Sequence, residues 1–422
     1  MYRLLLSSFL LLPVYSFPFD DQLVLSQGER IWKEQAIEKL WTERKKMAHT
    51  PLVQVEIPGV NHSTIFIKNE TASASGTLKH RFVWALVMWA VVEGRIKSNT
   101  IVYDSTSGNT GASEAYMCRL IGVPYTAVVA NELEHEKIKQ ITQFGGQIKK
   151  VNVSQRDFFA EKYAKENEGF FINQFGNADG AEEYHESGNY SQESVNVFHE
   201  ILLQMKHRNL SAPNYFIHSA GTGGTISSVG KYITRYNIPT QVVLADSEYS
   251  LFYDYVLNNK YSNETVNRPK WIAPGIAGIG YGYNPKPIMF KHSTSLLRTV
   301  INEVVRMPDI VTMAAMRSLR KKGIDGGAST ALNFIVALHK AIENEKKPSG
   351  HQSFVLIMGD PGKFYESTYL NNTWVEEKMK AAGGMAAINC WESHIDSAIN
   401  TGEDFVSTGS ADCTIDKLQH TY

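Results

Sequence analysis

A lysine stands at the entrance of an apolar helical stretch, directly after a turn of small residues. The turn spans residues 73–78 (SASGTL), and Lys79 follows it. Helix-end dipoles and an apolar surround disfavour the ammonium form of a lysine, which leaves an amine that can act as a nucleophile. Taken alone, the pattern also fits an ordinary surface lysine.

A second polar turn, residues 105–111 (STSGNTG), lies between an apolar strand pattern and a helical pattern. Its hydroxyls, its amide and the backbone N–H groups of a helix N-terminus can form an anion pocket. Because the turn carries no basic residue, it suits a small carboxylate better than a polyphosphate. A well-capped strand-to-helix turn is the alternative interpretation.

A third turn, residues 219–225 (SAGTGGT), also connects a strand pattern to a helical pattern. Glycines let its backbone close on an anion, and Thr222 and Thr225 add hydroxyl donors. It is not a Walker loop, since no Gly-Lys-Ser/Thr follows, and Ile226 stands where a dinucleotide fingerprint needs its third glycine. We therefore expect a single phosphate monoester. A nucleophilic lysine, a carboxylate pocket and a monophosphate pocket together describe a pyridoxal-phosphate enzyme acting on an amino acid.

The elements that must position these turns alternate between strand and helix from residue 64 onward, which predicts parallel sheets covered on both faces. The expected strands are Thr64–Lys68, Thr100–Asp104, Thr126–Ala130, Gln147–Val151, Phe170–Asn173, Tyr215–Ser219, Gln241–Asp246 and Ser353–Met358. The expected helices are Glu29–Trp41, Arg81–Val92, Ala112–Leu120, Glu134–Phe144, Arg156–Lys165, Val195–Met205, Ile226–Tyr236 and Thr330–Glu343.

This order predicts an α/β protein with two domains, each built on a doubly wound parallel sheet. Residues 80–185 form the smaller domain, and residues 17–79 and 186–380 form the larger one. After about Ala381 the pattern fades into a Gly-, Ala- and Ser-rich stretch, so we expect residues 381–422 to be a C-terminal tail.

Motifs in order from Thr50 to about Trp374 resemble the cysteine synthase/cystathionine β-synthase family of pyridoxal-phosphate enzymes, which have fold type II. The most specific motif is TSGNTG at residues 106–111. The others are residues 50–53 (TPLV), 75–79 (SGTLK), 173–177 (NQFGN), 221–225 (GTGGT), 274–278 (PGIAG), 326–329 (GGAS) and 365–368 (YEST).

The resemblance implies a role for each matching residue. Lys79 would hold the cofactor as an internal aldimine, and Asn109 would hydrogen-bond the hydroxyl of its ring. The phosphate would be bound by Gly221, Thr222, Gly223, Gly224 and Thr225. The α-carboxylate of the substrate would be bound by Thr106, Ser107, Thr110 and Gln174.

Two departures from the family pattern bear on the reaction. The helix after Lys79 carries bulky residues, namely His80, Trp84, Met88 and Trp89. The Ser or Thr that the family places near the pyridine nitrogen falls within residues 359–362 (GDPG). Either Asp360 faces the ring and keeps that nitrogen protonated, or Asp360 points to solvent and Pro361 faces the ring. The chain also lacks a haem-binding extension and a regulatory domain pair, which disfavours a full cystathionine β-synthase.

The first residues resemble a secretory signal peptide, with Arg3 ahead of the apolar run Leu4–Val14 and a cut expected after Ser16. An uncleaved anchor and a buried first helix are the alternatives. A secreted or lumenal protein would carry glycans on some Asn-x-Ser/Thr sites. We expect them among Asn61, Asn152, Asn209, Asn263 and Asn371, whereas Asn69 and Asn189 should stay bare.

Composition narrows the partners. Lys and Arg number 42 against 43 Asp and Glu, so a broad basic surface for nucleic acid is not expected. The sequence predicts no metal site, no membrane contact after removal of residues 1–16, and a homodimer. Among three cysteines, Cys118 should be a buried free thiol, and Cys390 could pair with Cys413 in an oxidising lumen.

These observations support three functional hypotheses. The first is an enzyme that eliminates or replaces the β-substituent of a small serine- or cysteine-like amino acid, with Lys79 also acting as general base. The second is a protein that keeps the pyridoxal-phosphate pocket without catalysis. The third is a phosphate- or nucleotide-binding protein without pyridoxal phosphate.

Overall fold

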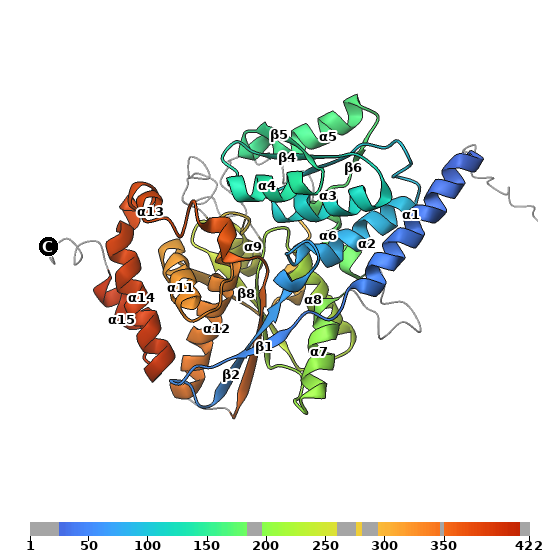
Figure 1. Ribbon diagram of the computed structural model, residues 1–422. Helices are drawn as coiled ribbons and strands as arrows, with labels where there is room; N and C mark the ends of the chain where they lie inside the picture. The colour runs from blue at the N-terminus through green and yellow to red at the C-terminus, as the bar shows by residue number, and fades with distance from the viewer. Residues whose placement is uncertain (1–24, 184–195, 260–275, 281–293, 347–349, 414–422) are drawn as a thin grey trace, which may run out of the picture.

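The computed structural model describes residues 25–183, 196–259, 276–280, 294–346 and 350–413 and contains two sheets (Figure 1). The larger sheet has the strand order β1-β2-β10-β7-β8-β9, and the smaller has the order β5-β4-β3-β6. Only the β1–β2 pair is antiparallel within these sheets. The α/β fold with parallel sheets is therefore confirmed.

The strands of the larger sheet are β1 (Leu52–Val55), β2 (Ser63–Asn69), β7 (Tyr215–Ser219), β8 (Gln241–Ser247), β9 (Glu303–Met307) and β10 (Gln352–Met358). Those of the smaller sheet are β3 (Val102–Ser105), β4 (Tyr125–Ala130), β5 (Gln147–Val151) and β6 (Phe170–Phe171). Each expected strand is present with its ends within two residues, whereas β1 and β9 were not expected.

The helices of the first half are α1 (Gln27–Lys46), α2 (Lys79–Val92), α3 (Asn109–Ile121), α4 (His135–Gln143), α5 (Arg156–Glu166), α6 (Gln174–Glu183) and α7 (Val197–His207). Those of the second half are α8 (Gly224–Arg235), α9 (Phe252–Asn258), α11 (Asp309–Lys321), α12 (Ala328–Lys346), α13 (Asn372–Lys378), α14 (Gly384–Thr401) and α15 (Phe405–Asp412).

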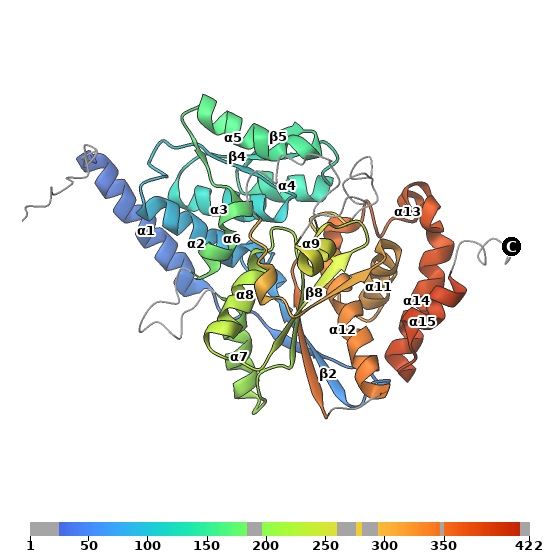
Figure 2. The same ribbon diagram turned by 180° about the vertical axis from the view of Figure 1, so that it is seen from behind.

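Alternating side chains of the larger sheet enter two different cores. In β10, Phe354 and Leu356 join one buried cluster, while Val355 and Ile357 join the other. This follows from the two-residue period of a strand. Figures 1 and 2 show α11, α12 and α14 on one side of this sheet and α7 and α8 on the other. A sheet buried on both faces is the reason that its strands read as continuous apolar runs.

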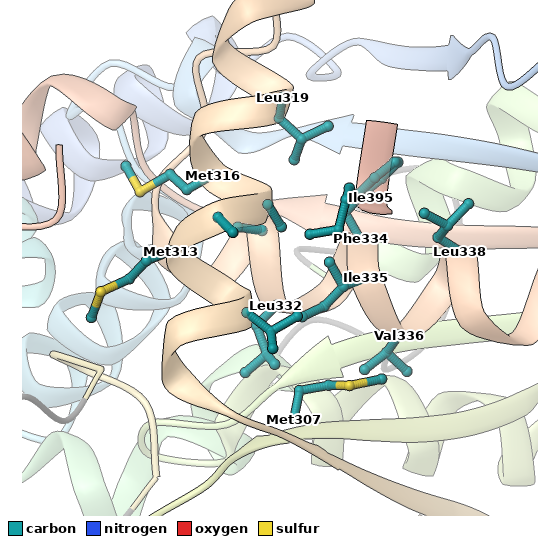
Figure 3. Close-up of a cluster of buried hydrophobic side chains, with 14 of the residues drawn as sticks. Met307, Met313, Met316, Leu319, Leu332, Phe334, Ile335, Val336, Leu338 and Ile395 are labelled. Carbon is teal, nitrogen blue, oxygen red and sulfur yellow. The ribbon is translucent and has the colours of Figure 1, made fainter. Parts of the chain in front are cut away.

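The expected C-terminal tail is wrong for residues 384–412, which form α14 and α15. Ile388, Trp391, Ile395 and Ile399 recur at helical spacing on α14 and are buried. Ile395 belongs to the same core cluster as Phe334 of α12 (Figure 3). The small residues between these positions let α14 pack closely on α11, and their presence was mistaken for a linker composition.

The sequence analysis placed residues 17–79, and therefore α1, in the larger domain. In the structure α1 packs on the smaller domain instead. Its buried Ala36 and Leu40 join the core cluster of α2 and α3. The bulky residues of α2 explain this packing: Trp84 Nε1 donates to Leu40 O at 2.6 Å, and its ring meets Trp41 edge to face at 5.4 Å. The unusual size of these α2 side chains therefore serves the contact with α1.

The remaining structural expectations have mixed outcomes. Residues 1–16 and Asn189 and Asn263 lie outside the described residues. Cys118 is a buried free thiol, and Cys390 and Cys413 form a disulfide, as expected. Within the described ranges, the structure has no helix with the length and apolarity that crossing a membrane requires.

Candidate active site

The chain segments that follow β2, β7 and β10 meet at one edge of the larger sheet, because these three strands are parallel neighbours. Met358, the last residue of β10, is level with Asn69 at the end of β2, and Leu356 is level with Ile217 of β7. The carboxyl ends of all three strands therefore point the same way, which is where open α/β sheets bind ligands. The chain after β2 leads to Lys79, that after β7 to the 221–225 turn, and that after β10 to Asp360.

The turn before Lys79 is fixed to both domains. Leu78 N donates to Gly359 O at 2.8 Å, and a Cβ on Gly359 would lie 2.5 Å from Leu78 Cδ2, so a larger residue would require the Leu78 side chain to shift. On the other side, the hydroxyls of Ser75 and Ser113 are 2.8 Å apart. These contacts hold Lys79 at the start of α2, between the two sheets.

Lys79 lies over an aromatic ring and close enough to His218 and Glu114 to act on both electrostatically. Its Nζ is 5.1 Å from the centre of the Phe82 ring. Burial, with a smaller effect from the Lys79 charge, lowers the pKa of His218 to about 3, so this imidazole is neutral near the lysine at ordinary pH. Lys79 also acts electrostatically on buried Glu114. The expected position of the lysine at a helix entry is confirmed.

The turn at 221–225 has the backbone geometry of an anion pocket. Gly223 has φ 84°, in the left-handed region, and a Cβ there would lie 2.5 Å from Leu296 Cα. A Cβ on Gly221 would overlap Gly278 O. Helix α8 begins at Gly224, so its N-terminal N–H groups face this turn. Glycine is required here by space as well as by φ.

The turn at 106–111 brings the four predicted carboxylate-binding residues together. Thr106 Oγ1 accepts hydrogen bonds from Gly108 N and Gly111 N at 3.1 and 3.0 Å. Thr110 Oγ1 donates to Gln174 Oε1 at 2.6 Å. Ser107 packs near Gly278, where an added Cβ would lie 3.3 Å from its Oγ. Since Gly278 also touches Gly221, the carboxylate and phosphate turns are adjacent.

Asp360 is buried and faces the site, so the alternative that it points to solvent is wrong. Its Oδ2 accepts from Asn109 Nδ2 and from the Tyr365 hydroxyl, each at 2.8 Å. Its Oδ1 and the Asn109 Oδ1 are buried and have no hydrogen-bond partner among the described residues. Burial raises the pKa of Asp360, although Lys137, Asn109 and Tyr365 oppose the rise. Two buried oxygen atoms next to the Asn109–Asp360 hydrogen bond therefore have no partner among the described residues.

Lys137 and Tyr365 adjoin this pair. Tyr365 belongs to the 365–368 motif, whereas Lys137 was not singled out from the sequence. Lys137 is buried, with its Nζ 4.5 Å from the centre of the Tyr365 ring and 3.4 Å from Glu134. A Cβ on Gly108 would lie 2.7 Å from the Lys137 side chain. A lysine among helical residues such as 135–143 reads as a solvated surface charge, and no periodicity signals that it packs under a glycine of another loop.

Two clusters of buried ionisable groups lie behind the site. In the first, Arg81 Nε and Nη1 donate to Glu70 and Glu200 at 2.8 and 2.9 Å, and Lys68 Nζ is 2.8 Å from Glu200. Burial alone would raise the pKa of Glu200, but Arg81 and Lys68 lower it far below its ordinary value. We call these four residues the paired cluster.

The second cluster, Asp104, Glu114 and Tyr125, contains two carboxyls and a phenol, and we call it the carboxyl cluster. Tyr125 OH donates to Glu114 Oε2 at 2.6 Å. Besides burial, the neighbouring Glu114 raises the pKa of Asp104, because two adjacent ionised carboxyls repel each other. Burial raises the pKa of Glu114 to about 7 and that of Asp104 well above its ordinary value.

Comparison with known proteins gives the class. Residues 44–359 match the family described as pyridoxal-phosphate dependent enzyme. A Caenorhabditis elegans protein named as pyridoxal-phosphate dependent is 54% identical, over 91% of this chain and 90% of that protein. The chain therefore belongs to the family of pyridoxal-phosphate dependent enzymes, which overturns the hypothesis of a phosphate- or nucleotide-binding protein without this cofactor.

Two further relatives refine the class. L-cysteine desulfhydrase Cds1 of Mycobacterium tuberculosis is 30% identical, over 85% of this chain and 94% of that protein. The crystal structure of O-ureido-L-serine synthase has a TM-score of 0.63 at 22% identity, over 78% of this chain and 94% of that one, and this likeness shows the fold. The protein is a pyridoxal-phosphate enzyme of the cysteine synthase/desulfhydrase type.

The residues of the site fit this cofactor. A glycine turn at a helix N-terminus suits its phosphate, and Lys79 offers the amine that such enzymes link to the aldehyde. The buried Oδ1 atoms of Asn109 and Asp360, without partners among the described residues, suit the polar edge of an aromatic ring.

Proposed function

We propose that this protein eliminates or replaces the β-substituent of a small serine- or cysteine-like amino acid. The observation that carries the proposal is the convergence of the Lys79, 106–111 and 221–225 turns with Asp360. It is supported by the hydrogen bonds Leu78 N to Gly359 O and Asn109 Nδ2 to Asp360. The relationship to L-cysteine desulfhydrase favours this substrate class.

Lys79 has two roles in this proposal. Its amine carries the cofactor covalently, and after the substrate takes its place it removes the proton from Cα as general base. When bound, pyridoxal phosphate would stabilise the electron pair left at Cα, and that pair can then form the Cα–Cβ double bond as the β-substituent leaves with the electrons of its own bond. Lys79 Nζ lies 5.1 Å from the centre of the Phe82 ring and close to the neutral imidazole of His218, and the second role uses its unprotonated amine.

The 106–111 turn recognises the α-carboxylate. Thr106, Ser107, Thr110 and Gln174 supply hydroxyl, amide and backbone groups without a cation. The Thr110 hydroxyl donates to Gln174 Oε1 and Gln174 Nε2 donates to Ser105 O, so Thr110 would exchange its bond for one to the carboxylate. Helix α3 begins at Asn109, so its N-terminus faces the same space. A negatively charged group of the size of a carboxylate fits this donor set. The same arrangement orients Cα, because a carboxylate held at one side fixes the direction of the bond to the proton.

Asp360 and Asn109 act on the cofactor ring in this proposal. Asn109 hydrogen-bonds the ring hydroxyl, and Asp360, held in place by Asn109 and Tyr365, keeps the pyridine nitrogen protonated, which makes the ring a stronger electron sink. Replacement of Asp360 by Ser should change the absorption spectrum, the cofactor affinity and the rate of α-proton exchange. If all three stay as in the wild type, Asp360 does not contact the nitrogen.

A titration of the purified holoprotein tests the reaction. L-cysteine, L-serine and O-acetylserine are added separately, and the cofactor absorption band is followed together with the release of sulfide or another leaving group. We expect the band to change with at least one of them, with turnover. A band that changes without product would instead favour a protein that binds amino acids without catalysis.

Borohydride reduction followed by peptide mass spectrometry tests Lys79. The pyridoxyl label should be found on Lys79 and should disappear in the Lys79→Arg variant. Lys137 is the natural comparison, because it is also a buried lysine next to the site. A label on Lys137, or on any other lysine of the wild type, contradicts the assignment.

We further propose that the protein enters the secretory pathway, loses residues 1–16 and is found in the lumen or outside the cell as a homodimer. The Cys390–Cys413 disulfide and the exposed positions of Asn61, Asn152, Asn209 and Asn371 support this route. Expression in a eukaryotic secretory host, with N-terminal sequencing, glycosidase treatment and light scattering, tests it. Retention of Met1 without a mobility shift would contradict export.

A further inference from the structure

Cys390, His394 and Cys413 lie together at the edge of the larger domain, away from the candidate active site. Cys390 and His394 are one turn apart on α14, so their side chains share a face of that helix. Cys413 directly follows α15. One ligand atom from each of the three residues lies within 4.8 Å of the others. Figures 1 and 2 show α14 and α15 packed side by side at this edge.

Two thiolates and an imidazole form a donor set that zinc prefers. The two cysteines are joined as a disulfide, with their Cα atoms 5.7 Å apart. Reduction by a phosphine would cleave the S–S bond with uptake of one water: the phosphine takes the oxygen, and the two sulfurs take the hydrogens. Zinc binding would then displace both thiol protons. The step therefore balances with a named reductant and one metal ion.

The two helices stay together without the disulfide. Gly409 of α15 packs so closely on Trp391 of α14 that a Cβ there would overlap the ring. Asp404 caps α15 through its bonds from Val406 N and Ser407 N, and it pairs with Lys346 at 2.7 Å. Phe405 is fully buried in the larger core. Reduced thiols would consequently remain near each other and near His394.

The carboxylate of Asp412 lies next to the imidazole of His394. His394 Nε2 lies 3.5 Å from Asp412 Oδ2, so a metal ion would use Nδ1. Metal-binding histidines ordinarily have such a carboxylate on the ring nitrogen that does not hold the metal. The cluster thus contains three ligands and an outer partner for the histidine, with the fourth position of a tetrahedral ion left to water.

We propose that Cys390, Cys413 and His394 bind Zn²⁺ when the disulfide is reduced, so that one cluster holds either a disulfide or a metal ion. The two states exclude each other because both use the same sulfur atoms. In an oxidising lumen the pair stays a disulfide, whereas in a reducing compartment the same residues form a zinc site. This site lies apart from Lys79, and the proposal does not depend on the reaction.

The experiment uses the full-length holoprotein before and after phosphine reduction, with the reductant removed under inert gas. Zn²⁺ content is measured by elemental analysis after dialysis, and Co²⁺ is used as a spectroscopic probe of tetrahedral thiolate coordination. The reduced protein should bind one ion per chain with thiolate-to-cobalt bands, and the oxidised protein should bind none at this site. A reduced protein that binds no Zn²⁺ overturns the proposal.

Variants assign the ligands. Cys390→Ser should abolish binding, and His394→Gln, which keeps the disulfide, should weaken Zn²⁺ binding at least roughly tenfold, since even outer partners have effects of that size. Cys118→Ser and His339→Gln are the matched controls and should bind Zn²⁺ as the wild type does. If His394→Gln binds Zn²⁺ as tightly as His339→Gln, or if Cys390→Ser keeps the ion, the proposed ligand set is wrong.

Discussion

The paired cluster and the carboxyl cluster both lie close to the start of α2. They differ in the state of their buried carboxyl groups, which are ionised in the paired cluster and protonated in the carboxyl cluster. Arg81, in the first turn of α2, and Lys68 meet the carboxylates of Glu70 and Glu200 at 2.8–2.9 Å. In the carboxyl cluster, Glu114 receives a hydrogen bond from a phenol and is near another carboxyl. Complementary charge keeps the first cluster ionised, whereas burial keeps protons on the second.

The difference separates two functions that buried charge can have. A fully paired cluster ties η1 (Glu70–Ala72), α2 and α7 to one another, so it fixes the helix that begins at Lys79. The carboxyl cluster carries a proton at a pKa near neutrality, with Lys79 acting on it electrostatically. It can therefore change charge within the pH range of catalysis, which the paired cluster cannot.

The largest expected effect concerns Arg81. Arg81→Met leaves Glu70 and Glu200 buried with one cation fewer, so the free energy of unfolding should fall by about 3–5 kcal/mol. Denaturant unfolding at neutral pH measures the change. Arg95→Met is the control, because Arg95 and Glu93 form an exposed pair at 3.6 Å, and it should change the stability by no more than about 0.5 kcal/mol. Equal effects of the two substitutions would contradict the account of the paired cluster.

The two clusters should change the free energy of unfolding with pH in opposite directions: the contribution of the paired cluster rises with pH, and that of the carboxyl cluster falls. The pKa of Glu200 is lowered in the folded state, so its contribution is present above the ordinary value of 4.5 and is lost as the pH falls. The pKa of Glu114 is raised to about 7, so its contribution is present below 4.5 and is lost as the pH rises to about 7. The carboxyl cluster should therefore lower the stability of the protein across that interval.

Glu114→Gln tests this second prediction, since the amide keeps the size of the side chain and cannot ionise. Its free energy of unfolding should fall less than that of the wild type between pH 4.5 and about 7. Glu166→Gln is the matched control at an exposed position and should keep the slope of the wild type. An unchanged slope in Glu114→Gln would mean that Glu114 is ionised in the folded protein.

Much of the fold was predictable because strands that are buried on both faces of a sheet consist of consecutive apolar residues, which are recognisable in the sequence. The strand over Tyr215–Ser219 was predicted to the residue. The edge strands Leu52–Val55 and Glu303–Met307 were missed, since their burial is partial and their apolar runs are short. Helix α14 was missed because its small residues were interpreted as the composition of a tail, although Ile388, Trp391 and Ile395 form a helical stripe.

The candidate site was predictable where backbone conformation dictates residue type. The glycines of the 221–225 turn have one conformation or one approach that demands them, and such demands appear in the sequence. Tyr365 was part of the quoted 365–368 motif and lies five residues after Asp360 in the chain. Lys137 was not predictable, because its place beside Tyr365 depends on how the two domains meet. The same holds for His394, whose nearness to Cys413 arises only from the packing of α14 on α15.

The smallest expected effect sharpens the comparison within the carboxyl cluster. Tyr125 OH donates to Glu114 Oε2 at 2.6 Å, a bond that favours the ionised carboxylate and lowers its pKa against the larger effect of burial. Tyr125→Phe should therefore reduce the free energy of unfolding by about 1 kcal/mol, the usual net value of such a bond. It should also raise the pH up to which the free energy of unfolding falls because of Glu114.

Unfolding measured across the same pH series gives both results, with Tyr236→Phe as the control at an exposed hydroxyl. A shift to lower pH would show that the phenol stabilises the protonated carboxyl, and the carboxyl cluster would then owe its protons to Tyr125 as well as to burial.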